Sequence, residues 1–133
     1  MEKKPDKKKS KLGMDPWVLV CVLVFVVMLG YMIHLWNQPE PPSLMVINTH
    51  TEKMDYGSYC EAEIGGDVFN IGGITATAVS IRCDAGPGTK RPMFTLIDEI
   101  AGKETVPFNV TVPLTSCYDA PTDNCVVAAC ANC

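Results

Sequence analysis

The strongest constraint on this sequence is an apolar run of 20 residues, WVLVCVLVFVVMLGYMIHLW, at positions 17–36. The run contains no Asp, Glu, Lys or Arg, and at about 1.5 Å per helical residue it would span a hydrocarbon core of about 30 Å. It is longer than the apolar region of a cleaved signal peptide, and no small-x-small cleavage site follows it. We therefore predict an uncleaved transmembrane helix over 17–36, with Trp17 and Trp36 at the two membrane interfaces.

The charges on the two sides of this run have opposite signs. Residues 1–16 carry six lysines against three acidic side chains, whereas residues 37–133 carry five basic and twelve acidic side chains. Because lysine and arginine beside a membrane span are retained on the cytoplasmic side, we expect the lysine-rich tail inside the cell and the acidic part outside. The lysines then serve orientation and contact with anionic lipid, and no nucleic-acid partner is expected.

The remaining chain divides into a short connector and one small domain. The segment 37–43, NQPEPPS, contains three prolines, which favour an extended spacer of about 20 Å. Residues 44–133 form the exterior domain, with a cysteine-rich tail over 117–133. A chain of this length excludes a large enzyme.

Within 44–133 the apolar residues alternate with polar ones, as in strands that have one buried face. We predict five strands, separated by turns rich in glycine, and a bulge within the second strand at Gly65–Gly66. Their ranges are 44–49, 59–69, 74–83, 93–97 and 106–114. Short strands at such spacing predict a small antiparallel β-sandwich that follows the transmembrane helix.

Three stretches resemble the FxLyD and CARDB-type immunoglobulin-like domains of bacterial and archaeal envelope proteins. They are GDVFNIGGITATAVSI at 66–81, IDEIAGKE at 97–104 and PFNVTV at 107–112, and the likeness covers about residues 57–113. The resemblance implies an immunoglobulin-like sandwich, an envelope location, and adhesion, scaffolding or partner binding. Its motifs specify strands and turns and contain no catalytic residue.

Six cysteines lie in the exterior part, and an even number in a small exported domain predicts up to three disulfides. They are Cys60, Cys83, Cys117, Cys125, Cys130 and Cys133. If the second and third strands form a hairpin or lie in facing sheets, Cys60 and Cys83 come to the same end. We therefore expect them to pair, and the other four to pair within the tail.

The tail cysteines also allow other chemistry. Cys117, Cys125, Cys130 and Cys133 could supply four thiolates to zinc, and the last three have the first ligand spacings of a plant-type [2Fe–2S] ferredoxin. A reactive redox dithiol is a further alternative. We favour disulfides, because an exported domain meets an oxidising compartment, and we expect no cofactor and no bound metal.

Little in the sequence points to catalysis. Acidic groups at Asp55, Glu61, Glu63 and Asp67 could bind calcium on one sheet face, but they lack a calcium-loop motif. Asn109-Val110-Thr111 is a glycosylation sequon that we place on the outward face of the last predicted strand.

These observations predict a non-enzymatic protein, anchored in the plasma membrane by one helix, whose exterior domain binds another envelope protein or serves a membrane complex. One alternative is a redox or metal-binding subunit built on the tail cysteines. Another is a filament subunit, because KSKLG at 9–13 resembles the leader of a type IV pilin precursor, which is cut after the glycine, here Gly13.

Overall fold

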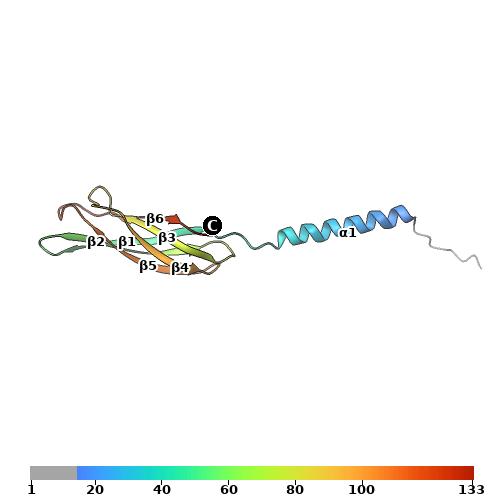
Figure 1. Cartoon of the computed structure of the whole chain (residues 1–133), viewed down its shortest axis with the longest axis horizontal. Coiled ribbons are helices and arrows are strands. Elements are labelled where there is room, and N and C mark those ends of the chain that lie inside the picture. The colour runs from blue at the N-terminus through green and yellow to red at the C-terminus, as the bar shows by residue number, and fades with distance from the viewer. Residues whose placement is uncertain (1–14) are drawn as a thin grey trace, which may run out of the picture. The chain divides into compact units, whose positions relative to one another are not determined.

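The computed structural model describes residues 15–133. It divides into two compact units, one up to Gln38 and one from Pro39 to Cys133. The first contains a single helix and the second contains six strands (Figure 1). The lysine-rich tail and Gly13 lie outside the described residues.

Helix α1 spans Pro16–Trp36 and is long and apolar enough to cross a membrane. Proline occupies its first turn, where a missing N–H costs nothing, and the N–H of Asn37 closes the last turn on the carbonyl of Ile33 at 3.1 Å. No residue of α1 is buried, although large apolar side chains surround the helix. A helix that is apolar on all sides needs an apolar environment, and its bounds agree with the prediction to within one residue.

The second unit contains six antiparallel strands, which run along its length (Figure 1). Sheet A has the order β1-β2-β5 and sheet B the order β4-β3-β6. The strands are β1 Leu44–Asp55, β2 Cys60–Asn70, β3 Ala76–Asp84, β4 Met93–Ile100, β5 Thr105–Pro113 and β6 Asn124–Ala129. The five predicted strands are confirmed, whereas β6 and the second half of β1 were not predicted.

The core lies between the two sheets. Its largest fully buried side chains include Ile64 and Val112 from sheet A and Val79 and Ile81 from sheet B. At the sides, β5 lies beside β4 and β1 lies beside β6. Alternate residues of each sheet therefore face the partner sheet, as the period of two predicts.

The glycine pair in β2 does not form the predicted bulge. Gly65 and Gly66 pair in register with β5, and the register shift lies instead in β1, between Ile47 and His50. A side chain at Gly65 would overlap the His50 ring, and one at Gly66 would press on the ring of Phe108. The two glycines thus make room for neighbouring side chains while β2 stays regular.

One hydrogen bond joins the two sheets along the β1 side. The Thr49 hydroxyl donates to Oδ2 of Asp123, just before β6, at 2.6 Å. This bond is the largest of the causes that hold the pKa of the Asp123 carboxyl below its usual value of 3.8. The carboxylate form is therefore the one that the fold favours.

The proline-rich segment belongs to the domain from Glu40 onward, which differs from the predicted free spacer. The Glu40 carbonyl accepts hydrogen bonds from the N–H groups of Gly73 and Ile74 at 3.0 and 3.2 Å, and the Ser43 carbonyl accepts one from Ile71 at 2.7 Å. The Lys103 ammonium lies 3.4 Å from the Glu40 carboxylate. Residues 40–43 are thus fixed to the domain, so they cannot act as a free spacer of the predicted length.

Candidate functional site

The most distinctive surface is at the end of the domain opposite Leu44, where tyrosines gather on two connections. We call it the tyrosine loop end. It comprises residues 55–60, the turn between β1 and β2, and residues 114–123, the connection from β5 to β6. Tyr56 and Tyr59 are about half exposed, and Tyr118 is 98% exposed. Exposure of apolar area to water is unfavourable, so a group of three exposed aromatic side chains marks a candidate interaction site.

Local hydrogen bonds fix the turn that carries two of these tyrosines. Oδ1 of Asp55 accepts from the N–H of Gly57 at 2.8 Å, and Gly57 has a φ of 83°, a conformation that glycine adopts without strain. The N–H of Tyr56 donates to the carbonyl of Tyr59 at 3.1 Å. The two rings stack with their centroids 4.8 Å apart. The turn therefore presents a preformed aromatic pair.

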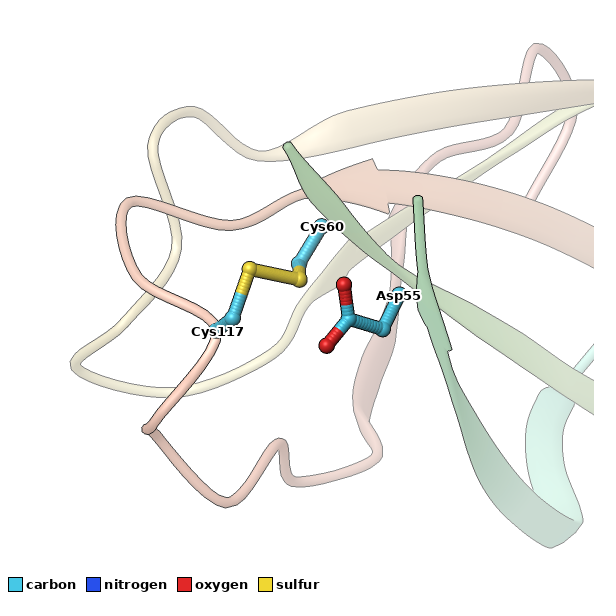
Figure 2. Close-up of side chains that lie close together, drawn as sticks. All are labelled: Asp55, Cys60 and Cys117. Carbon is cyan, nitrogen blue, oxygen red and sulfur yellow. A yellow bond between two sulfur atoms is a disulfide. The ribbon is translucent and has the colours of Figure 1, made fainter. Parts of the chain in front are cut away.

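One disulfide ties the second connection to sheet A, and another ties β6, the strand that follows it, to β3. Cys117 bonds to Cys60 at the start of β2 (Figure 2), and Cys125 bonds to Cys83 in β3. The Lys53 ammonium also donates to the carbonyl of Cys117 at 2.9 Å. The segment that carries Tyr118 is thus covalently linked to sheet A before it and to sheet B after it.

A shallow hollow of about 430 Å³ lies between the two connections. Its lining includes Asp55, Gly57, Ser116 and Tyr118. Tyrosine, serine and glycine are enriched in the loops by which antibody β-sandwiches bind other proteins, since rigid rings supply contact area and small residues supply adaptable hydrogen bonds. The residues that line the hollow are therefore suited to binding another protein.

The hollow does not form a metal centre. An oxygen of Asp55 and the sulfurs of Cys60 and Cys117 lie within 4.8 Å of one another, and Figure 2 shows the carboxylate beside the disulfide. The two sulfurs are bonded to each other, so neither is a thiolate that could bind a cation.

All six cysteines of the second unit form disulfides, but the predicted pairing of Cys60 with Cys83 is wrong, and so is the expectation that the other four pair within the tail, since only Cys130 and Cys133 do so. The pairs are Cys60–Cys117, Cys83–Cys125 and Cys130–Cys133. Strands β2 and β3 lie in facing sheets, but Cys83 is directly opposite Cys125 on β6, and Cys60 meets Cys117 on the connection that follows β5. The four tail cysteines therefore belong to three separate bonds and do not form the alternative zinc or iron–sulfur set.

The other predicted site residues are scattered. Asn109 and Thr111 face outward from β5, as predicted, and Nδ2 of Asn109 donates to Oε1 of Glu63. Glu61, Glu63 and Asp67 alternate along β2 on the outer side of sheet A, whereas Asp55 is paired with Cys60 at the loop end. The predicted acidic group thus divides between two places.

Trp17 and Trp36 lie at opposite ends of α1 and are 77% and 92% exposed. The tyrosines of the loop end were not predicted as a site. The signal was present in the stretch YGSY at 56–59, which joins two alternating segments and places aromatic residues where turns are usually polar.

Comparison with known proteins gives no match: no family model, no curated protein and no solved structure is significantly similar to this chain. The resemblance to FxLyD and CARDB-type domains stays a prediction.

Proposed function

We propose that this protein is a single-pass, membrane-anchored binding protein that docks another envelope or membrane protein through its tyrosine loop end. The observation that carries the proposal is the exposure of Tyr56, Tyr59 and Tyr118 on connections that disulfides and hydrogen bonds hold in place. Rigid exposed aromatic residues bind with a small loss of conformational entropy. No catalytic role or cofactor is included in the proposal.

The membrane location is supported by α1 and by the charge difference around it. We place α1 across the plasma membrane with the lysine-rich tail in the cytoplasm, Trp17 and Trp36 at the interfaces, and the domain outside. Three disulfides fit an oxidising exterior compartment. Protease added to intact cells should then degrade residues 39–133 and spare the tail. Protection of the domain would contradict this orientation.

We further propose that the domain is of the immunoglobulin-like class. The order β1-β2-β5 corresponds to strands A, B and E of that fold, and β4-β3-β6 to C′, C and F. This correspondence and the resemblance of residues 57–113 support the same class. Neither of the two disulfides that reach the core links β2 directly to β6, unlike the B–F bond of antibody domains.

Site-specific cross-linking tests the docking surface. A photoreactive phenylalanine analogue is placed at Tyr118 and, as a matched control, at Phe94, which is 58% exposed on the outer face of sheet B. After illumination of native membranes, we expect a discrete larger species from position 118 only. Cross-linking from position 94 without any from position 118 would place the contact on sheet B and overturn the proposal.

Intact mass tests the alternative functions. The protein from native membranes should lose no residues and bind no metal, and six thiols should react with an alkylating agent only after reduction. Loss of the first 13 residues would instead support a filament subunit processed after Gly13.

A further inference from the structure

The three disulfides differ in how far they are shielded from solvent. Cys60 is 3% exposed and Cys83 is fully buried, so each of the first two bonds has one sulfur in the core. In the third bond, Cys130 is half-buried and packs against the core, whereas Cys133 is exposed. Access by a thiolate is one of the factors that set the rate of disulfide exchange, so Cys130–Cys133 is the most open of the three.

Cys130–Cys133 also closes the shortest loop, because its cysteines are three positions apart in the sequence Cys-Ala-Asn-Cys. Opening a loop this short releases little chain entropy, so the fold depends on this bond much less than on the other two. Cys-x-x-Cys is also the spacing at which thiols readily become reactive.

Hydrogen bonds hold the Cys-x-x-Cys loop without help from the disulfide. Oδ1 of Asn132 accepts from the N–H of Thr77 at 2.9 Å and from its hydroxyl at 3.2 Å, and Nδ2 of Asn132 donates to the carbonyl of Thr75 at 2.8 Å. The N–H of Ala131 donates to the carbonyl of Thr77 at 2.9 Å. None of these bonds involves a cysteine sulfur. The loop therefore keeps its shape, and its two thiols stay close together, when the bond opens.

The two sulfurs are not equivalent. Cys133 offers an exposed sulfur to an incoming thiolate, whereas Cys130 is half-buried and packs against the core. Attack therefore falls on Cys133, and Cys130 is the sulfur that leaves and later closes the bond again.

We propose that Cys130–Cys133 is a thiol–disulfide exchange site that dithiols open and close while the domain stays folded. The thiolate of a dithiol attacks Sγ of Cys133, a mixed disulfide forms, and Cys130 leaves as a thiolate that takes up a proton. The second thiol of the dithiol then loses its proton and attacks the dithiol sulfur of the mixed disulfide, so Cys133 leaves as a thiolate and takes up a proton. Two electrons pass to the protein, and the dithiol becomes a disulfide. The site does not depend on the proposed docking function.

The test titrates the full chain in detergent micelles with dithiothreitol, followed by alkylation and peptide mass mapping. We expect Cys130 and Cys133 to be labelled at about tenfold lower dithiothreitol than the four other exterior cysteines. The strand signal in circular dichroism should be unchanged at that point. Labelling of all six cysteines together, or of Cys130 and Cys133 last, would overturn the proposal.

A matched pair of variants tests the order of attack. Cys130→Ser leaves Cys133 as a free thiol, and Cys133→Ser leaves Cys130. Glutathione disulfide should modify Cys133 in the first variant about tenfold faster than Cys130 in the second. Equal rates, or a faster reaction at Cys130, would overturn the proposed order.

Discussion

The end of the domain opposite the tyrosines depends on one buried amide, and replacing this amide should lower the free energy of unfolding. Among the described residues, Asn70 is the one polar side chain in the core. Its Nδ2 donates to the carbonyls of Ile74 and Ile100 at 2.8 and 3.1 Å. Its Oδ1 accepts from the N–H groups of Gly72 and Ser43 at 3.1 and 3.3 Å. The side chain is therefore fully satisfied and joins four segments.

Substitution Asn70→Ala leaves these four backbone groups without partners. The bonds to Ile100 and Gly72 are buried, whereas those to Ile74 and Ser43 are partly buried and can be replaced by water. At about 1 to 2 kcal/mol for each buried orphan, the free energy of unfolding should fall by about 2 to 4 kcal/mol. The isosteric change Asn70→Asp leaves no cavity and should still cost about 2 kcal/mol, because a carboxylate cannot donate to the two carbonyls.

Urea denaturation of the full chain in detergent, followed by circular dichroism, measures the effect. With a slope of about 1 kcal/mol per molar urea, the midpoint should fall by about 2 to 4 M for Asn70→Ala. The control is Asn109→Ala, which removes an exposed amide bonded only to Glu63 and should cost less than about 0.5 kcal/mol. Equal midpoints for the two alanine variants would refute the reasoning.

Three further predictions concern other contacts of the domain. Gly102→Ala should cost about 3 kcal/mol in urea denaturation, because its Cβ would overlap the backbone of Gly73; a neutral result would contradict the close approach. Joint replacement of Cys60 and Cys117 by alanine opens a bond between residues 57 positions apart, which should lower the stability by about 4 kcal/mol, and a loss below about 1 kcal/mol would be incompatible with this. In an NMR titration, the pKa of Asp123 should lie below 3.8 and rise toward that value in Thr49→Val. Because the pKa of Asp123 is lower in the folded protein than in the unfolded one, the contact stabilises the fold above about pH 3.8. This stabilisation is lost as the pH falls through the folded pKa. An unchanged pKa in the variant would exclude the hydroxyl as its cause.

The local pattern of the sequence predicts most elements but not all of them. The apolar run and the alternating stretches predict α1 and five strands, because each signal lies within the element itself. The second half of β1, from Thr51 to Asp55, is polar at most positions and carries little alternation. Strand β6 is only six residues long, and β3 and the Cys83–Cys125 bond hold it in place. Neither the pairing of β6 with β3 nor the Cys83–Cys125 bond can be predicted from the local sequence.

The disulfide pairing was mispredicted for a related reason. The expectation for Cys60 assumed that the segments on either side of Asn70–Gly73 bring their cysteines to a shared end within reach of each other. In the fold, β2 and β3 do continue to the same end, but Cys83 is directly opposite Cys125 on β6 and Cys60 meets the connection that follows β5. Which strands become neighbours depends on the whole core, so an even cysteine count predicts the number of bonds better than their partners.

The arrangement of the disulfides separates the two proposals experimentally. The chain runs covalently from sheet A through Cys60–Cys117, along the connection that carries Tyr118, and through Cys125–Cys83 to sheet B. Binding at the tyrosine loop end should therefore weaken when the Cys60–Cys117 bond is removed, because the connection would have to be ordered on binding. Opening Cys130–Cys133 lies outside this covalent path and should leave cross-linking at Tyr118 unchanged. A domain reduced only at Cys130 and Cys133 that loses this cross-link would show that the exchange site controls docking.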